Sequence, residues 1–318
     1  MKQFIFVFLL LFNICARGDF FQEWIDDFKS YALEQGISPK TLNASLNNIA
    51  FSPQVVDAYH NQKENHQSAF SFVFDYIKKL FVLTERIEEG RLKMREHHDL
   101  LEEVSQKYHV PIQYIVALWA VESRYGAETE KYPVIQTLAT LAFASNRKEM
   151  FKKELILALK MIDQGYVNAN SFYGSWAGAM GQCQFMPSSF FEFAVEINGK
   201  KDIWDSLPHV FGSIANYLKK SGWNEDEPWG HQILLPFGFK GEIGLKKKYT
   251  NDQLQNMGVR KIGGGDLEFL KTQTSIIMPL GPSGPTYLIY PNFRIILRWN
   301  KSQKFALSVC ILADGLIR

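Results

Sequence analysis

Hydrophobic residues recur at helical spacing over most of the first 230 positions of the chain. A fresh helix start is indicated at Ser38-Pro39, where a capping residue precedes a proline in the first turn. Another start is indicated at Pro111, and Gly126 marks the corresponding end. The pattern predicts helices over residues 19–46 with the break just named, 70–107 as more than one helix, 111–126, 133–141, 147–162, a segment restarting at Pro187, and 210–220.

The pattern changes after Trp229, where short apolar runs alternate with clusters of glycine and proline. Such runs, bounded by turn residues, are typical of strands. The strand candidates are residues 233–235, 276–278, 287–290 and 295–297. We therefore expect an α+β fold that is predominantly α, with a helical region over 19–230 and a smaller mixed strand and helix lobe over 231–318.

The first 18 residues have the pattern of an export signal, with Lys2 before an apolar run over residues 4–14. That run is too short for a comfortable bilayer span. Small residues Ala16 and Gly18 favour cleavage before Asp19, which predicts a periplasmic protein. A rival is lipid attachment at Cys15, although bulky Ile14 stands where a lipid-attachment signal prefers a small residue.

Charge and composition narrow the range of ligands. The 35 basic and 33 acidic residues leave a net charge of +2, which argues against nucleic acid because phosphate binding favours a strong basic excess. Aromatic residues make up 14% of the chain, a stock that suits the apolar faces of sugar rings as well as core packing. After the predicted cleavage Cys183 and Cys310 remain, and we expect two separate thiols.

One carboxylic acid, Glu122, interrupts an almost wholly apolar helical run from Tyr114 to Val121. Burying an ionised carboxylate is costly, so such a residue is paired or protonated. Arg124 lies two positions along the helix, on the wrong side for pairing. Trp119, one turn earlier, can keep the carboxyl group dry and raise its pKa. We interpret Glu122 as a proton donor.

A glycine-rich loop over residues 174–184 supplies a second element of a site. Its small residues allow close approach of a bulky substrate. Ser175, Gln182 and Gln184 offer neutral hydrogen bonds that suit sugar hydroxyl and acetamido groups. Together with Glu122 they favour protonation of a glycosidic oxygen. A purely structural glycine-rich connection beside a buried glutamate explains the same residues equally well.

Other chemistries find less support in the sequence. The seven histidines show no HExxH pattern and no pairing with cysteine, and residues 196–202 place lysines where a calcium loop needs carboxylates. We therefore expect no metal and no cofactor. The sequence contains no GxSxG, and Cys183 has no histidine nearby along the chain, so nucleophilic catalysis is a weak hypothesis.

The ordered motifs of the chain resemble those of the family B lytic murein transglycosylases. The resemblance extends over nearly all of the chain after residue 18, and the set of motifs is specific where each alone is not. The segments that carry it are Trp119–Gly126, Pro133–Phe143, Gly178–Phe190, Ile214–Leu218, Arg298–Ser302 and Phe305–Leu307.

The resemblance implies a lysozyme-like helical catalytic core and cleavage of the MurNAc-GlcNAc β-1,4 bond of peptidoglycan. It implies that Glu122 acts first as acid and then as base, taking the proton of the MurNAc C6 hydroxyl so that a 1,6-anhydro ring closes. Such substrate-assisted chemistry needs no second carboxylate. The alternatives are a hydrolytic muramidase, in which water attacks C1, and a non-catalytic peptidoglycan-binding scaffold.

By position in the family pattern, the implied substrate-binding residues are Ser175, Gln184, Tyr217, Trp299, Asn300 and Arg147. Arg147 would meet the carboxylates of the stem peptide. Cys183 departs from the pattern, because proline or glycine is usual at its position. The expected partner is the peptidoglycan glycan strand, bound by a monomer without nucleic acid, and peripheral attachment to a membrane is left open.

Overall fold

The structure, a computed structural model, describes residues 19–61, 69–128, 131–279 and 281–318. The chain forms two compact units. The α7–α8 unit is drawn from Met1–Lys78 and Gly126–Val210, and the α6–α13 unit from Lys79–Tyr125 and Phe211–Arg318. The chain crosses from one unit to the other three times: within α4 (Ala69–Glu96) after residue 78, after Tyr125, and within α10 (Leu207–Lys220) after residue 210. The domain boundary that the sequence places between residues 230 and 231 stays a prediction.

The α7–α8 unit is built around its two namesake helices, which pack along each other. Leu138 and Leu141 of α7 and Leu155 and Leu159 of α8 are fully buried. Phe21, in the helix over residues 19–34, packs edge-on against Phe143 of α7 at 5.5 Å between ring centroids. The elements of this unit are α2 (Pro39–Leu46), α3 (Pro53–Asn61), β1 (Tyr132–Pro133), α7 (Val134–Ala144), α8 (Lys148–Asp163), the 3₁₀ helix η1 (Ala169–Ser171), β2 (Tyr173–Gly174) and α9 (Pro187–Phe193).

The helical part of the α6–α13 unit consists of α5 (His98–Tyr108), α6 (Ile112–Ser123), α12 (Pro291–Trp299) and α13 (Gln303–Leu316), together with parts of α4 and α10. Helix α6 packs against α13. Small residues such as Ala117 on α6 and Ala306 and Ala313 on α13 are fully buried, which permits a close approach of helix axes. Trp229 joins this packing by donating its indole N–H to Asp314 Oδ1 at 3.1 Å.

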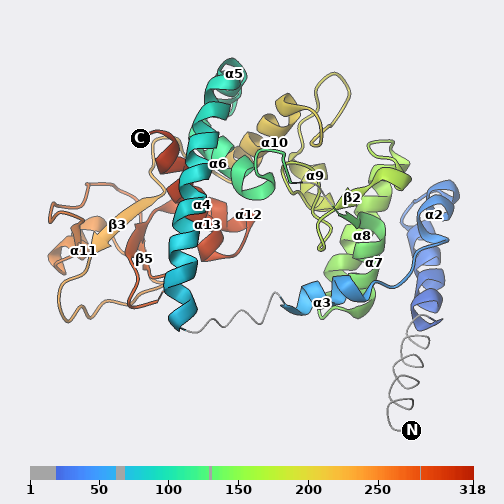
Figure 1. Cartoon of the computed structure of the whole chain (residues 1–318), viewed down its shortest axis with the longest axis horizontal. Coiled ribbons are helices and arrows are strands. Elements are labelled where there is room, and N and C mark those ends of the chain that lie inside the picture. The colour runs from blue at the N-terminus through green and yellow to red at the C-terminus, as the bar shows by residue number, and fades with distance from the viewer. Residues whose placement is uncertain (1–18, 62–68, 129–130, 280) are drawn as a thin grey trace, which may run out of the picture. The chain divides into compact units, whose positions relative to one another are not determined.

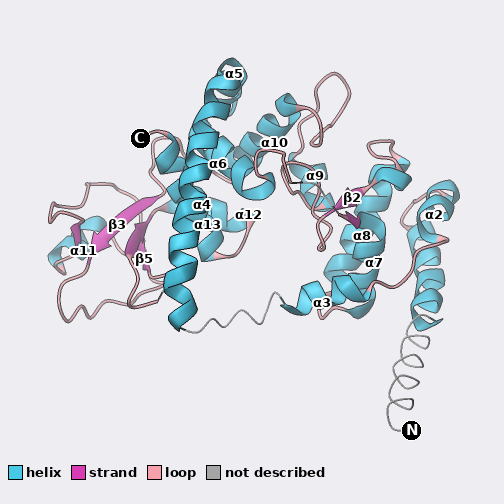
Figure 2. Ribbon diagram, in the orientation of Figure 1, coloured by secondary structure: helices cyan, strands magenta, loops and turns pink. Residues whose placement is uncertain are grey.

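The same unit carries an antiparallel sheet in the order β4-β3-β6-β5, seen with α11 in Figure 2. The strands are β3 (Gly230–Leu234), β4 (Arg260–Lys261), β5 (Ser275–Ile277) and β6 (Thr286–Ile289). Ile233, Ile276 and Leu288 form a core with α11 (Asn251–Asn256), to which Leu254 and Val259 contribute. The residues from Gly230 to Tyr290 are called the sheet lobe below.

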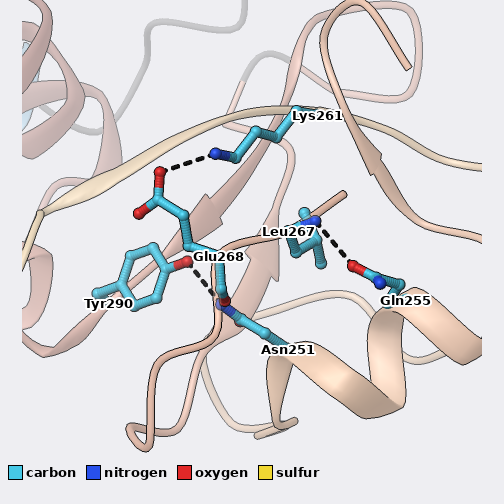
Figure 3. A network of polar contacts seen from close by, with 6 residues as sticks. All are labelled: Asn251, Gln255, Lys261, Leu267, Glu268 and Tyr290. Carbon is cyan, nitrogen blue, oxygen red and sulfur yellow. Dashed lines mark hydrogen bonds and ion pairs between the residues drawn. The ribbon is translucent and has the colours of Figure 1, made fainter. Parts of the chain in front are cut away.

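Polar contacts close the loop that follows β4 over this core (Figure 3). Buried Asn251 donates to the Glu268 carbonyl at 2.6 Å and to the Tyr290 hydroxyl at 2.9 Å. Gln255 Oε1 accepts from the Leu267 N–H at 2.8 Å, and Lys261 pairs with Glu268 at 2.7 Å. A loop that is rich in glycine and poor in regular structure thereby obtains partners for its backbone groups.

Most of the predicted elements are confirmed, and one is wrong. Residues 295–297 form part of helix α12 rather than a strand. Pro291 occupies the first turn of this helix, and Phe293 and Ile296 are buried one turn apart, so the short apolar run belongs to a helical stripe. Short apolar runs carry no periodicity that separates strand from buried helix. The helical start at Pro111 is confirmed, but α6 ends at Ser123, three residues before Gly126.

The predicted signal segment 1–18, with Cys15, lies outside the described residues. None of the helices in the described ranges combines the length and the apolar character that a bilayer span requires. Cys183 and Cys310 are both buried free thiols, as expected.

Replacing Asn292 by alanine tests the packing of α12. Asn292 is fully buried, donates to the carbonyls of Asn224 at 2.7 Å and Glu227 at 2.6 Å, and accepts from the Asn224 N–H at 3.1 Å. Asn292→Ala leaves these backbone groups without their hydrogen-bond partner, so we expect the free energy of unfolding to fall by about 2–4 kcal/mol. Urea denaturation measures it, with exposed Asn256→Ala as control. An equal, small effect of both variants would contradict the role assigned to Asn292.

Candidate active site

Glu122 lies in the last turn of α6, where the helix is forced to stop. The next three residues after Ser123, which are Arg124, Tyr125 and Gly126, all have positive φ, at 49°, 57° and 81°. Arg124 caps the helix by donating its backbone N–H to the carbonyls of Trp119 and Ala120. Unpaired carbonyls concentrate at a helix C-terminus and disfavour a negative charge there. The local backbone therefore favours the neutral form of the Glu122 carboxyl group.

The partner of this carboxyl group comes from a distant part of the sequence. Trp299, the last residue of α12, donates its indole N–H to Glu122 Oε1 at 2.6 Å. The Trp299 ring in turn lies against the Tyr217 ring of α10, with centroids 4.5 Å apart and planes inclined by 55°. Three of the sequence-predicted site residues are thus brought together in the α6–α13 unit.

Two opposing effects set the proton affinity of Glu122. Burial raises the pKa of Glu122 from its ordinary value of 4.5 to about 8, and the hydrogen bond from Trp299 acts in the opposite direction. The burial effect is larger, because a desolvated anion loses more stabilisation than one neutral N–H donor returns. The side chain therefore carries its proton at neutral pH and can donate it.

The sequence predicts that Trp119 shields the Glu122 carboxyl group, but the structure places the Trp119 ring among other aromatic rings. Its ring is buried and packs against Phe211 at 5.0 Å, Tyr125 at 5.3 Å and His97 at 6.1 Å between centroids. This aromatic cluster stabilises the end of α6 from within the unit. The ring that is hydrogen-bonded to the Glu122 carboxyl group is that of Trp299.

Asn300 follows Trp299 directly and is exposed. It is the C-cap residue of α12, and its side-chain oxygen accepts the backbone N–H of Ser302 at 3.0 Å. The carboxamide therefore shapes the turn between α12 and α13.

The glycine-rich loop lies in the α7–α8 unit, and Ser175 organises its first half. The Ser175 Oγ accepts the backbone N–H groups of Ala177 at 3.3 Å and Ala179 at 3.1 Å. Its own N–H donates to the Ala179 carbonyl at 2.8 Å. With its oxygen engaged by two donors, the hydroxyl group retains its proton for an acceptor outside the loop.

Gln184 stands in the second half of the loop in a left-handed conformation, with φ of 48°. Its side-chain amide donates to the Gly181 carbonyl at 3.1 Å. Gly181 itself has φ of 63°, and a Cβ atom there would lie 2.6 Å from the Ile203 carbonyl oxygen, so this turn requires glycine. Cys183 between them is fully buried and its Sγ lies 3.6 Å from the Val210 carbonyl oxygen, consistent with a filler role.

Arg147 is exposed at the N-terminus of α8, also in the α7–α8 unit. Its guanidinium group lies 5.6 Å from the centroid of the Phe151 ring and 2.7 Å from the Met150 sulfur. These contacts hold the guanidinium group beside α8, and the residue remains exposed. The structure thus places Glu122, Tyr217, Trp299 and Asn300 in one unit and Ser175, Gln184 and Arg147 in the other.

Sequence reasoning missed Glu154, a second buried carboxylate. It lies on α8 and accepts the Ser188 N–H at 2.9 Å and the Ser188 hydroxyl at 2.7 Å. This pair fixes the start of α9, directly after the loop that carries Gln184. An acid within the apolar stripe of α8, together with a serine following Pro187, is the signal that could have revealed it.

Within residues 196–202, Ile197 and Lys200 exchange backbone hydrogen bonds, with the Ile197 N–H donating at 2.9 Å and the Lys200 N–H at 3.1 Å. The Asp202 carboxylate accepts the N–H groups of Trp204 at 3.0 Å and Asp205 at 2.9 Å. Across the part of the chain that the structure describes, no group of three or more histidine, cysteine, aspartate or glutamate side chains could hold a metal ion.

Nearly the whole chain matches one known protein family. The family described as "Transglycosylase SLT domain" matches residues 20–314. The chain belongs to this family. Its motif-bearing segments, including those that carry Glu122 and the glycine-rich loop, all fall within the matched range.

Several individual proteins are also similar to the chain. The chain is 32% identical over 251 residues to membrane-bound lytic murein transglycosylase B of Escherichia coli strain K12, covering 75% of this chain and 66% of that protein, just under two thirds of its length. Among solved structures, Pseudomonas aeruginosa SltB3 in complex with NAG-NAM-pentapeptide matches with a TM-score of 0.85 and 37% identity, covering 93% of this chain and 79% of that one. The Escherichia coli lytic transglycosylase SLT35 in complex with bulgecin A matches with a TM-score of 0.76 and 29% identity over 95% and 94% of the chains. The lysozyme-like fold is thereby confirmed.

The raised pKa of Glu122 predicts a specific pH dependence of stability. The folded protein keeps a proton that the unfolded chain releases above pH 4.5, so the free energy of unfolding falls as pH rises from 4.5 to about 8. Glu122→Gln removes this dependence. As the pH rises from 5 to 9, we expect the free energy of unfolding of the wild type to fall by roughly 2–5 kcal/mol relative to that of the variant. Urea denaturation of both proteins at pH 5 and pH 9 measures this difference. If the free energy of unfolding changed equally with pH in both proteins, a raised pKa of Glu122 would be contradicted.

Proposed function

We propose that the chain is an exported lytic murein transglycosylase, a lyase that cleaves the MurNAc-GlcNAc β-1,4 bond of peptidoglycan and leaves 1,6-anhydro-MurNAc ends. The observation that carries this proposal is the Glu122 carboxyl group, held at the end of α6 with a pKa of about 8 and a hydrogen bond from Trp299. Names of similar proteins support it. One is a lytic murein transglycosylase, and SltB3 has been solved with NAG-NAM-pentapeptide and with NAG-anhNAM-pentapeptide.

In the first step, the protonated Glu122 donates its proton to the glycosidic oxygen as the bond to C1 of MurNAc breaks. The leaving GlcNAc end departs as an alcohol, and positive charge develops at C1. A carboxylic acid with a pKa near the working pH is suited to this transfer. The resulting carboxylate is still hydrogen-bonded by the Trp299 N–H, which stabilises the new negative charge.

In the second step, the Glu122 carboxylate removes the proton from the C6 hydroxyl of the same MurNAc, whose oxygen attacks C1. The 1,6-anhydro ring closes and Glu122 is again protonated, so the cycle consumes no water. A carboxylate in water is too weak a base for this step, whereas desolvation makes it stronger. The balance between burial and the Trp299 bond therefore serves both the acid and the base role.

The substrate-binding residues are proposed in two groups. In the α6–α13 unit, the partly exposed Trp299 ring, packed on the buried Tyr217 ring, is suited to a sugar ring, with Asn300 next to Trp299 in sequence. In the α7–α8 unit, Ser175 carries a hydroxyl group and Gln184 a carboxamide group, both of types suited to sugar substituents. Arg147 supplies a surface cation for the carboxylates of a stem peptide. No cofactor takes part in this proposal.

Replacing Glu122 by glutamine keeps the shape of the side chain and removes its proton transfer. We expect Glu122→Gln to lower turnover of purified sacculi by at least about a hundredfold while binding to sacculi is retained. Mass spectrometry of the wild-type products should show ends that lack one water relative to reducing ends. Products with reducing ends would instead indicate a hydrolytic muramidase. Full activity of the variant would overturn the assignment of the acid.

Replacing Trp299 by phenylalanine keeps an aromatic ring against Tyr217 and removes the N–H donor. Because this hydrogen bond lowers the pKa of Glu122, its loss should raise that pKa and move the alkaline limb of the pH–rate profile to higher pH. The maximal rate should fall about tenfold as the carboxylate loses its donor. Trp299→Tyr, which restores a donor, is the matched control. An unmoved limb in Trp299→Phe would contradict this role.

A further inference from the structure

The sheet lobe exposes an unusual share of large apolar side chains. Of the eleven such side chains that are exposed in the described residues, six lie between residues 234 and 269. The side chain of Phe237 is completely exposed, and that of Phe269 is 73% exposed. Single exposed apolar residues are ordinary, whereas a concentration in one small lobe indicates a contact surface. The six are Leu234, Phe237, Ile243, Met257, Ile262 and Phe269.

Strand register places several of these side chains together. Leu234 of β3 is opposite Arg260 of β4, and Ile262 is the first residue of the turn after β4, two residues beyond Arg260, so both apolar residues belong to the β3–β4 edge of the sheet. Leu234 lies on the face of β3 opposite to that of Ile233, which joins the core with α11. Leu234 and Ile262 are 48% and 52% exposed.

A turn follows β3 directly. The Phe239 N–H donates to the Pro236 carbonyl at 3.2 Å, which closes a turn with Phe237 inside it. A Cβ atom on Gly258 would lie 3.1 Å from Pro236, so the turn is adjacent to the end of α11 and to Met257. Leu234, Phe237, Met257 and Ile262 are called the β3–β4 patch below.

The lobe around the patch is basic. Residues 231–290 contain seven lysines and arginines against four acids, a net charge of +3, whereas the whole chain has +2. Lys240 is exposed three residues after Phe237, and Lys246, Lys248 and Lys271 are exposed elsewhere on the lobe. Arg260 is engaged with backbone carbonyls and with Asp266, so the lysines supply most of the available positive charge.

We propose that the β3–β4 patch docks the protein on a bilayer that contains anionic lipids. Phe237 and the neighbouring aliphatic side chains enter the interfacial region, while the lysines of the lobe attract the phosphate headgroups. Apolar insertion combined with basic charge is the combination by which proteins bind a membrane surface without spanning it. A phenylalanine at a turn tip among aliphatic neighbours has no polar group beside its ring, so it suits acyl chains better than it suits sugars, which present hydroxyl groups along with their apolar faces. The docking is independent of the chemistry at Glu122.

Vesicle co-sedimentation tests the docking, with the chain starting at Asp19, which retains every described residue and has no site for lipid attachment at Cys15. We expect binding to vesicles of phosphatidylcholine with phosphatidylglycerol, weaker binding to phosphatidylcholine alone, and a decrease as salt rises. Phe237→Ser should lower the partition coefficient about tenfold, as expected for loss of one inserted phenylalanine. Lys240→Glu should lower it on anionic vesicles only.

Phe20→Ser is the matched control, because Phe20 is 62% exposed and lies in the α7–α8 unit. It should bind vesicles as the wild type does. Circular dichroism and melting temperature verify that both serine variants fold, and their release of soluble muropeptides should equal that of the wild type, so docking is scored separately from turnover. Equal vesicle binding by Phe237→Ser and wild type would overturn the proposal. So would a loss of sacculus binding without any loss of vesicle binding, which would assign the patch to the wall polymer.

Discussion

The contact between the Glu122 carboxyl group and the Trp299 indole N–H is the interaction on which the site depends. Desolvation raises the pKa of Glu122 and favours the protonated form, which can act as an acid. A hydrogen bond alone would hold it ionised at neutral pH. Their opposition brings the pKa of Glu122 to about 8, where both protonation states are accessible to one residue. The proposed mechanism, in which a single side chain gives and then takes a proton, uses this balance.

The surrounding structure holds the Glu122 carboxyl group and the Trp299 indole at hydrogen-bonding distance. Three left-handed residues after Ser123 end α6 abruptly and leave Glu122 in the final turn. On the other side, Pro291 begins α12 and Asn292 ties its first turn to residues 224 and 227, so that Trp299 ends the helix at a defined position. Tyr217 supports the indole ring from α10. The geometry therefore rests on helix ends whose positions are determined by buried hydrogen bonds and ring contacts.

The two units contribute differently to the proposed function. The α6–α13 unit holds the proposed acid Glu122, its donor Trp299 and the Tyr217 ring, whereas the glycine-rich loop of the α7–α8 unit offers a rigid set of polar groups. The loop is rigid because Ser175 and Gln184 use part of their hydrogen-bonding capacity on its own backbone. The sheet lobe adds a surface whose apolar and basic character has no role in that chemistry. The proposed wall cleavage and the proposed membrane docking thus rest on separate parts of one chain.

Local sequence determined the helices, the proton-donor hypothesis for Glu122 and the loop around Gly181, because periodicity, an acid in an apolar run and glycine clusters are readable within a few residues. It failed for residues 295–297, where a short apolar run has no period of its own. The partner of Glu122 could not be read locally, since Trp299 is 177 residues away and reaches it only after α6, α10 and α12 have packed. The same holds for Glu154, which meets Ser188 from another helix. The sequence determines which groups are costly to bury. Only tertiary packing decides which distant group compensates that cost, because desolvation and hydrogen bonding depend on distance in space and not on distance along the chain.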